Sequence, residues 1–355
     1  MQNLNEKDWN AIQLTTIFDK ISRGKRLKKA DHISGNIPYV SSTASQNGTD
    51  GSCGNSIGVR MFENCLTLAN SGSVGACFYH PYRFIASDHV TVLKRNNTCV
   101  DCYLSLSALI SRLGEKYNFN REINDIRISR ERIMLPVSND GSPDYKYMAE
   151  YMQQKREAML SRYRAYVEKR IVELGEPVEI PALNEKEWHE FPLDDIFTVD
   201  AGKRLETRNK VAGTRPFIGA TDNGNGVTGF VGNDNASKDN NVLGVNYNGA
   251  PCIAFYHPYE CIFTDDVKRL HLRNYKDNMF VLLFFTSVFA QQRSKYSYGY
   301  KFKEQRMLRQ KLMLPVNDSG EPDYEYMEQY SKNMMIKKYK QYLVYMDRKG
   351  GKPVE

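Results

Sequence analysis

The sequence lacks the features of a secreted or membrane protein. Its longest uninterrupted apolar run, residues 279–285, has seven residues, whereas a helix needs about 20 to cross a bilayer. The first residues contain no basic stretch followed by an apolar segment, so we expect neither a signal peptide nor a membrane partner. A cytoplasmic protein is therefore expected.

Cysteine is scarce and shows no metal-binding pattern. The seven cysteines are an odd number, and we expect them to be free thiols. Cys99 and Cys102 have the spacing of half a zinc or redox site, but no second Cys-x-x-Cys and no His-x-x-x-His motif completes a set of four ligands. We predict no metal site.

Motifs of catalysis are also missing. No Gly-x-x-x-x-Gly-Lys-Ser/Thr loop is present, and no Gly-x-Gly-x-x-Gly stretch connects an expected strand to an expected helix. The Asn/Asp-Pro-Pro-Tyr/Phe tetrapeptide of amino-methyltransferases and the Gly-x-Ser-x-Gly elbow of hydrolases are absent as well. We expect no catalytic residue and no cofactor in this chain.

One pattern superficially suggests a metal-dependent nuclease. Asp323 follows Pro322, and Asp347 stands two residues before Lys349, as in a Pro-Asp…Asp/Glu-x-Lys motif. Such groups must converge on one cation, but these stand at the two ends of an expected helix, about 36 Å apart by helix rise. The sequence therefore disfavours nuclease chemistry.

What the sequence does contain is a long duplication. Segments of the first half recur in the same order in the second half, at offsets of 177 to 179 residues. Solenoid repeats are about 20–50 residues long, so this repeat is a whole domain with its connector. We predict two domains with pseudo-twofold symmetry, suited to a target with two halves. The recurring segments are residues 9–18 and 188–197, 24–27 and 202–205, 78–82 and 255–259, 134–137 and 313–316, and 143–145 and 322–324.

The composition is that of an ordinary globular protein. Hydrophobic residues make up 41% and charged residues 26% of the 355 residues, which is enough chain for two hydrophobic cores. The net charge of +7 permits a nucleic-acid or acidic-protein partner without requiring one.

Each repeat has the same expected order of elements, which gives an α+β fold. A short strand at the tryptophan precedes a Gly/Asn-rich stretch of exposed turns, at residues 41–58 and 219–235. Strands are expected over 88–93 and 266–272, and apolar helices over 103–113 and 278–291. In the second of these helices Phe280, Leu283, Phe284 and Val288 form a stripe at helical spacing, which indicates a core face.

A long polar helix is expected to end each repeat. Pro143 and Pro322 suit first-turn positions, each is followed by an aspartate, and a glycine stands where each helix would stop. The sequence thus predicts domains at 1–142 and 188–321, long helices at 143–174 and 322–349, a linker at 175–187 and a tail at 350–355. We expect the helices to pair antiparallel along a heptad-like seam, formed by Met148, Met152, Met159, Tyr163 and Tyr166 in one and Met327, Met334, Tyr342 and Tyr345 in the other.

Several duplicated residues are candidates for DNA contact. Lys25 and Arg26, and their counterparts Lys203 and Arg204, follow a glycine just past a strand and are placed to reach phosphates. The Tyr-His-Pro-Tyr segments are either DNA contacts or packed structural corners fixed by proline. The basic and aromatic residues that precede each Leu-Pro-Val are either DNA contacts or solvated surface. These remaining candidates are Tyr79, His80, Tyr256, His257, Arg127, Arg130, Tyr298, Lys301 and Lys303.

The ordered duplication resembles the DNA-specificity subunit of Type I restriction–modification systems, over nearly the whole chain. The resemblance rests on Trp-x(4)-Leu-x-x-Ile-Phe, Gly-Lys-Arg-Leu, a Gly/Asn-rich loop, Leu-Pro-Val and a long helix in each half. It implies two target-recognition domains that each read one half of a bipartite double-stranded DNA target, and an antiparallel coiled coil that sets the spacer. The helices here are about 30 residues long, shorter than in the commonest members, so the related subunit of bipartite Type IIB systems is a serious alternative.

The resemblance also implies partners in a prokaryotic, cytoplasmic complex. Two adenine methyltransferase subunits would bind S-adenosylmethionine and flip the target base, joined by a restriction–translocase subunit or replaced by a fused nuclease–methyltransferase chain. This chain would be a recognition subunit without catalysis. Two other functions stay open from the sequence: a stand-alone DNA-binding regulator or anti-restriction protein, and a self-sufficient nuclease.

Overall fold

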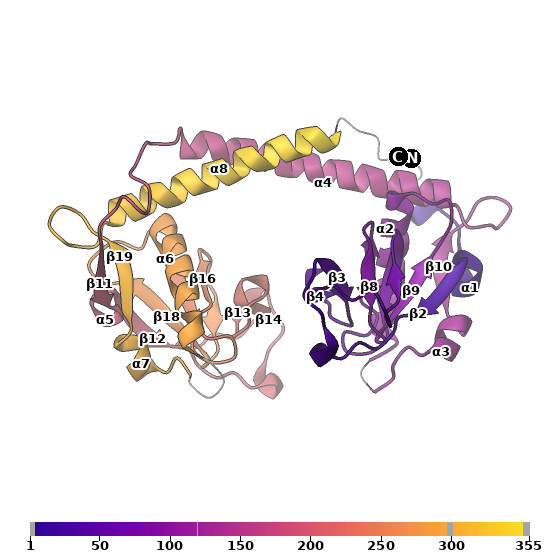
Figure 1. Ribbon diagram of the computed structural model, residues 1–355, viewed down its shortest axis with the longest axis horizontal. Helices are drawn as coiled ribbons and strands as arrows, with labels where there is room; N and C mark the ends of the chain where they lie inside the picture. Colours follow the sequence, from indigo (N-terminus) through magenta and orange to yellow (C-terminus); the bar gives the residue numbers. More distant parts are fainter. Residues whose placement is uncertain (1–3, 119, 297–300, 351–355) are drawn as a thin grey trace. The chain divides into compact units, whose positions relative to one another are not determined.

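The computed structural model describes residues 4–118, 120–296 and 301–350. The chain divides into two compact units, residues 1–163 and 164–355 (Figure 1). Within the described ranges no helix combines the length and the apolarity that crossing a membrane requires. All seven cysteines are free thiols, as the sequence predicts.

The globular domain of the first unit contains three sheets. A two-stranded sheet joins the first and the last strand of the domain, the main sheet has four antiparallel strands, and a second four-stranded sheet includes one parallel pair. Their orders are β1 (Trp9–Gln13)–β10 (Arg132–Pro136); β2 (Lys20–Arg23)–β9 (Val90–Lys94)–β6 (Cys65–Ala69)–β7 (Cys77–His80); and β4 (Thr49–Cys53)–β3 (Ile37–Val40)–β8 (Phe84–Ala86)–β5 (Met61–Phe62). The helices of this domain are α1 (Leu14–Ile17), α2 (Val100–Ser111) and α3 (Asp125–Arg130).

The second unit repeats this topology, as the duplication predicts. Its first two sheets correspond strand for strand, whereas its third sheet has three strands instead of four. The orders are β11 (Trp188–Pro192)–β19 (Lys311–Pro315); β12 (Phe197–Ala201)–β18 (Val267–Leu272)–β15 (Val242–Asn246)–β16 (Ala254–His257); and β14 (Val227–Val231)–β13 (Arg215–Ile218)–β17 (Ile262–Phe263). Its helices are α5 (Leu193–Ile196), α6 (Met279–Gln291) and α7 (Glu304–Leu308).

The main sheet of the first domain is buried on both faces. Successive side chains of a strand point to opposite faces, so Leu66 and Leu68 of β6 pack with Leu106 and Ile110 of α2. The intervening strand positions face the other way, where Cys65 packs with residues of β3 and β8. Helix, main sheet and second sheet therefore form three layers, which explains why all five residues of β6 are buried.

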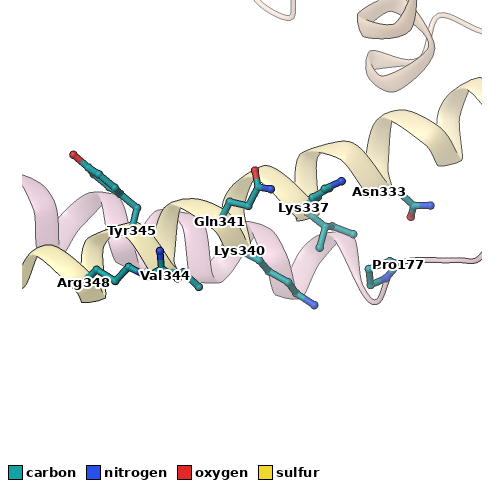
Figure 2. A pocket seen from close by; sticks show the side chains of 9 residues that line it. Pro177, Asn333, Lys337, Lys340, Gln341, Val344, Tyr345 and Arg348 are labelled. Carbon is teal, nitrogen blue, oxygen red and sulfur yellow. The ribbon is translucent and has the colours of Figure 1, made fainter.

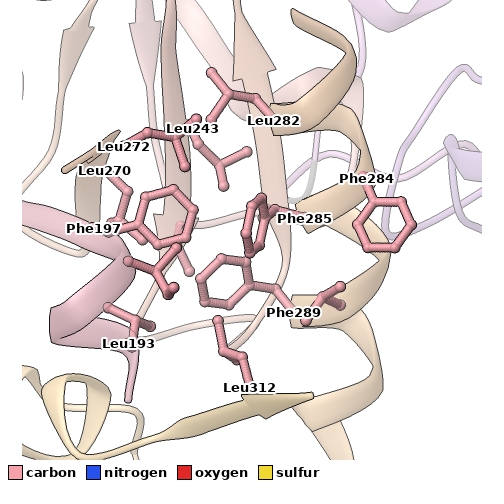
Figure 3. Close-up of a cluster of buried hydrophobic side chains, with 14 of the residues drawn as sticks. Leu193, Phe197, Leu243, Leu270, Leu272, Leu282, Phe284, Phe285, Phe289 and Leu312 are labelled. Carbon is pink, nitrogen blue, oxygen red and sulfur yellow. The ribbon is translucent and has the colours of Figure 1, made fainter. Parts of the chain in front are cut away.

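The second domain has the same layers, with α6 covering the main sheet. Phe285 and Phe289 of α6 pack on Phe197, Leu243 and Leu270 (Figure 3). The predicted apolar stripe is therefore displaced on the helix: Phe284 and Val288 are buried as expected, but Phe280 and Leu283 are only half-buried. The reason is that α6 packs against two neighbours, the sheet and the long C-terminal helix, so its apolar surface is wider than one stripe.

The two long helices are α4 (Tyr145–Leu174) and α8 (Tyr324–Gly350). Their 30 and 27 residues correspond to lengths of about 45 and 40 Å. Asp144 Oδ1 accepts a hydrogen bond from the Tyr147 amide, and Asp323 Oδ1 accepts one from the Tyr326 amide, both at 2.9 Å. The aspartates thus cap the helices, and the prolines precede the helices instead of occupying their first turns.

Each capping aspartate is also held by a lysine from the start of its repeat. Lys7 Nζ lies 2.8 Å from Asp144 Oδ2, and Lys186 Nζ lies 2.7 Å from Asp323 Oδ2. The same contact therefore ties the first segment of each repeat to its long helix.

The end of α4, residues 164–174, lies in the second unit and pairs with α8 there. Arg164 forms an ion pair with Asp347, and the ring of Tyr166 meets the edge of Tyr339. Positions therefore descend along α8 as they ascend along α4, which is the antiparallel direction that the sequence predicts.

The predicted seam of these helices is only partly right: Tyr166 contacts Tyr339 of α8, but other predicted positions lie elsewhere. Met148 and Met327 are buried, but they belong to the cores of the two domains. Met159, Tyr163, Tyr166 and Tyr345 are exposed, whereas Val167 and Ile336 are fully buried. Bulky residues at helical spacing predict that one face of a helix is apolar, but they do not predict which part of that face is buried. In this structure much of the face is exposed.

Candidate nucleic-acid interface

A glycine anchors each duplicated Lys-Arg pair to the main sheet. The Gly24 amide donates to the Val90 carbonyl at 3.1 Å, and the Lys25 amide donates to the Ala86 carbonyl at 2.9 Å. The second copy repeats both bonds, from Gly202 to Val267 and from Lys203 to Phe263. A Cβ atom at Gly24 or Gly202 would lie 2.0 or 1.9 Å from a backbone oxygen, so only glycine allows this approach.

The cations that follow these glycines point into solvent. Lys25, Arg26, Lys203 and Arg204 are all exposed, and none forms an ion pair with a carboxylate in the described part of the chain. Exposed guanidinium and ammonium groups without acidic partners are suited to phosphate contact. The structure also exposes Lys28 and Lys29 nearby, which sequence reasoning missed although they follow in the next few positions.

Other loops gather at the same end of the first domain. The Ser73 amide donates to the Ser42 carbonyl, and the Ile123 amide donates to the Asn70 carbonyl. Arg23, just before Gly24, lies 3.8 Å from Asp125 at the start of α3. We call this surface, residues 24–26, 41–48, 70–75 and 112–125 apart from 119, the loop end of the first domain.

The second domain has an equivalent loop end, formed by residues 202–204, 219–226, 247–253, 292–296 and 301–306. Arg293, after α6, lies 3.5 Å from Asp222 in the Gly/Asn-rich loop. Lys268, which pairs with Ala201 just before Gly202, forms an ion pair with Glu304 of α7. The structure therefore brings α7 and the Lys203–Arg204 pair to one end of the domain.

The long helix leaves each domain from the opposite end of its main sheet. Strand β9 begins at Val90, which contacts Gly24 at the loop end, and Arg95 follows its other end. The Arg95 guanidinium lies 3.7 Å from the centre of the Tyr145 ring in α4. In the second domain Tyr275, beyond the far end of β18, stacks on Tyr324 of α8. Each domain thus separates its loop end from its helix attachment (Figure 1).

The predicted basic residues before each Leu-Pro-Val lie around α3 and α7. Arg130 and Lys303 are exposed, whereas Arg127 and Lys301 are half-buried. The guanidinium of Arg127 donates to the Glu122 carbonyl, a contact within its own segment. Tyr298 lies outside the described residues.

The structure favours the packed-corner alternative for the Tyr-His-Pro-Tyr segments. His80 and His257 have no exposed surface, and burial lowers the pKa of each imidazole to about 4. Tyr79 and Tyr256 are half-buried, and their hydroxyls donate to Asn64 and Asn241, respectively. These contacts lie at the end of β7 or β16 away from the loop end, so the recurrence reflects a shared core.

The Gly/Asn-rich stretches form hairpins at the loop end. Their tips are 3₁₀ turns, η3 (Ser45–Gly48) and η6 (Gly224–Gly226), in which Gln46, Asn47 and Asn225 adopt positive φ angles. Gly224, Gly226 and Gly229 do have the spacing of a dinucleotide-binding motif. They connect β13 to β14 rather than a strand to a helix, so they build no phosphate cradle of that kind.

Two large apolar side chains are exposed in or after these hairpins. Phe230, in β14, is 61% exposed, and Ile57, in the segment that follows β4, is 90% exposed. Sequence reasoning did not single out Phe230, because an apolar residue in a short strand is expected to be buried. Its exposure on a hairpin makes Phe230 a candidate for contact to a base methyl group.

The second domain carries a charge cluster that has no counterpart among the described residues of the first domain. His271 lies 2.7 Å from Asp277 and 3.1 Å from Asp239, and Arg269 lies 2.9 Å from the same Asp239 oxygen. The hydrogen bonds to Asp239 and Asp277 raise the pKa of His271 to about 10. The imidazole is therefore charged at neutral pH. In the part of the chain that is described, no group of three His, Cys, Asp or Glu residues is placed to hold a metal ion.

A shallow apolar groove runs along α8 in the second unit. It has a volume of about 740 Å³, and Val344 and Tyr345 in it are each about half exposed. Figure 2 shows its lining side chains along the helix, with Pro177 from the segment after α4 at one end. Exposed apolar surface of this kind is typical of a protein–protein contact.

A duplicated domain, two basic loop ends and long paired helices define a recognition protein built from two similar modules. Residues 6–169 and 185–343 match the family described as the Type I restriction modification DNA specificity domain. The chain is also 35% identical, over 341 residues, to the Type II restriction enzyme specificity subunit S.BcgI from Heyndrickxia coagulans. That alignment covers 92% of this chain and 94% of the relative.

Two solved structures are similar over nearly their full lengths. The S subunit of a Type I restriction–modification system from M. genitalium is 16% identical with a TM-score of 0.46, covering 98% of this chain and 94% of that one. The HsdS subunit from Thermoanaerobacter tengcongensis is 12% identical with a TM-score of 0.32, covering 97% and 92%.

The chain belongs to the Type I restriction–modification DNA specificity family. It is a DNA specificity subunit of a restriction–modification system, a recognition component and not a catalytic one.

Proposed function

We propose that each globular domain reads one half of a bipartite DNA target through its loop end. The domains are residues 1–142 and 188–321, joined by the long helices and the 175–187 linker. The observation that carries this proposal is the matched anchoring of Gly24 and Gly202, which presents an exposed Lys-Arg pair in the same way in both domains. The hairpins beside these pairs differ in sequence, as two readers of different half-sites require.

The residues divide into two roles under this proposal. Lys25, Arg26, Lys203 and Arg204, with Arg130 and Lys303 nearby, hold the phosphate backbone and carry no base information. Side chains of the hairpins, Phe230 among them, enter a groove and distinguish bases.

The partners follow from this division of labour. The chain has no cofactor of its own in the proposal, and adenine methyltransferase subunits supply S-adenosylmethionine and flip the base. We place two such subunits on the long helices, where the groove around Val344 and Tyr345 offers apolar surface. A restriction–translocase subunit, or a nuclease fused to the methyltransferase, completes the cytoplasmic complex.

The proposal predicts that the Lys-Arg pairs control affinity rather than sequence choice. Replacing Lys203 and Arg204 together by alanine should weaken binding to specific and random duplexes alike. It should also lower the slope of log K against log salt by about one to two, because each phosphate contact contributes about 0.9. Binding is measured by fluorescence anisotropy with the full chain, alone and with its methyltransferase partner.

Lys276→Ala is the control, because Lys276 is an exposed cation beyond the far end of β18. It should change neither affinity nor slope. If the double variant instead lost preference at one base while keeping its salt slope, Lys203 and Arg204 would be base readers.

A further inference from the structure

The hairpin at each loop end turns through three successive residues in the left-handed region. In residues 46–48 the φ angles are 49°, 54° and 80°, and in residues 224–226 they are 57°, 52° and 74°. The Ser41 amide donates to the Gly48 carbonyl at 2.9 Å, and the Gly219 amide donates to the Gly226 carbonyl at 2.8 Å. The two turns therefore share one backbone conformation.

The turns differ in sequence at their first left-handed residue. Asn47 and Gly48 recur as an asparagine and a glycine at an offset of 178, but Gln46 stands where the second domain has Gly224. Glycine adopts a positive φ without steric cost, and asparagine is enriched there, whereas the side chain of glutamine makes this conformation unfavourable. The turn itself thus favours glycine at position 46, and its backbone gives no reason for glutamine.

Contacts inside the protein do not account for the glutamine either. Gln46 is exposed, and within the described ranges its carboxamide has no hydrogen-bond partner. The turn beneath it is fixed, since Gly48 is buried and a Cβ atom there would lie 3.3 Å from the Phe78 ring. The Ala44 amide also donates to Ser73 Oγ at 3.1 Å. An ordered turn therefore presents a free carboxamide to solvent.

This hairpin begins beside the Lys-Arg pair of the first domain. The Lys25 amide donates to the Ala86 carbonyl at 2.9 Å, and Val40 pairs with the same Ala86 between the parallel strands β3 and β8. The Ser87 amide donates to the Val40 carbonyl, also at 2.9 Å. Because residues 41–48 follow Val40 directly, a DNA backbone held at Lys25 passes close to this hairpin.

We propose that Gln46 reads one A·T base pair in the half-site bound by the first domain, through two hydrogen bonds to the adenine edge in the major groove. The carboxamide offers a donor for adenine N7 and an acceptor for the N6 amino group. The second domain has no reader at this position, because Gly224 has no side chain. This proposal rests on the proposed function, which places the loop end on DNA.

Two variants of the full chain, bound to its methyltransferase partner, test the role of Gln46. Methylation sequencing first gives the target, and exchange of residues 1–142 identifies the half-site of the first domain. Gln46→Gly should reduce the discrimination against other base pairs at one A·T position by about 5- to 100-fold. Gln46→Glu keeps the side-chain length but should lose the same preference, because a carboxylate cannot donate to adenine N7.

The measurement is competition binding, followed by fluorescence anisotropy, with duplexes that each differ from the target at one base pair. The second half-site and the salt slope should stay unchanged in both variants, because no phosphate contact is removed. Asn97→Gly is the matched control, since Asn97 is an exposed residue with a φ of 50° beyond Arg95, at the helix-attachment end of the domain. It should alter no base preference.

Thermal unfolding separates base reading from a structural role. The midpoint of Gln46→Gly should not fall, because glycine accepts the left-handed conformation more readily than glutamine does. A lower midpoint would mean that Gln46 supports the hairpin, and would contradict the proposal. The reciprocal variant Gly224→Gln should lower the midpoint, and an unchanged midpoint would remove the steric argument.

The binding results also distinguish this proposal from the proposed function. Unchanged discrimination at every position in Gln46→Gly overturns the reading by Gln46, and a loss confined to a G·C pair overturns the assignment to adenine. If the unmodified complex showed no preference in the half-site of the first domain, the proposed function itself would fail. A preference that is present in the unmodified complex and intact in Gln46→Gly would leave the proposed function standing.

Discussion

At the scale of single residues, the second domain depends on a charged histidine. His271 connects Asp239, which is bridged to Cys261, with Asp277, just before α6. The cluster therefore ties the inner strand β18 of the main sheet to the start of the helix that covers this sheet. Position 94, a lysine in β9, occupies the corresponding place in the first domain.

This cluster predicts a pH dependence of stability. The pKa of His271 is raised to about 10 in the folded protein, above its unfolded value of about 6.5. The stabilisation is thus fully present below about pH 6.5 and is lost as the pH rises through about 10. We expect His271→Gln to lower the free energy of unfolding by about 1–2 kcal/mol at pH 6, since partial exposure of the ring reduces the effect.

Chemical unfolding of the full chain at pH 6 and pH 10 measures this difference. The difference in free energy of unfolding between the unmodified protein and the variant should shrink toward pH 10. Comparing the two proteins at each pH removes the contribution of the groups that titrate equally in both. A gap of constant size would mean that the histidine acts through packing.

Sequence alone could not separate binding residues from structural ones at this scale. The Gly-Lys-Arg and Tyr-His-Pro-Tyr segments recur equally well in both halves, and both were candidates. Their outcomes differ because His80 packs against Phe84 and hydrogen-bonds Thr67 of the neighbouring strand β6, contacts that exist only once the strands have paired. Only the folded chain reveals that Lys25 is exposed and His80 is not.

At the scale of elements, the long helices are candidates for the structure that sets the distance between the two half-sites. Inserting four residues after Gln153 and four after Lys332 adds about 6 Å to each helix and turns it by about 400°, so the paired faces nearly keep their register. We expect the unread spacer in the DNA to lengthen by about one or two base pairs, at 3.4 Å each, with both half-sites unchanged. Methylation sequencing of a host carrying the variant and its partner reads the result.

A single insertion in one helix is the control, because it mismatches the pair and should impair assembly. An unchanged spacer with full activity in the double variant would mean that the helices do not set the distance between the half-sites. Residues 175–187 would then be the better candidate.

The helices themselves were predictable, whereas their contact face was not. A run without glycine, opened by an aspartate and rich in Lys, Glu and Tyr, predicts a long solvated helix. The fully buried residues Val167 of α4 and Ile336 of α8 are single β-branched residues in otherwise polar sequences. Their burial depends on the partner segment, which no periodicity in one helix specifies.

At the scale of the whole molecule, the two domains should be separable readers. Exchanging residues 1–142 for the first domain of another family member should change one half of the methylated target and leave the other half intact. The reason is that each loop end is built from one domain's own residues. Methylation sequencing before and after the exchange is the measurement, and the reciprocal exchange of 188–321 is its control. A change in both halves after one exchange would refute the two-reader model.

The way each domain closes has a consequence for how the protein is made. Trp9 pairs with Pro136 and Trp188 with Pro315, so the first and last strands of each domain are neighbours although 127 residues separate them (9 to 136 and 188 to 315). A domain cannot complete its fold before its last strand leaves the ribosome. At about 5–20 residues per second, the last strand of the first domain follows its first strand by roughly 6 to 25 s, and the second domain closes one repeat length later. The first domain thus has time to fold alone before a domain of similar topology, whose strands could pair with its own, has been synthesised.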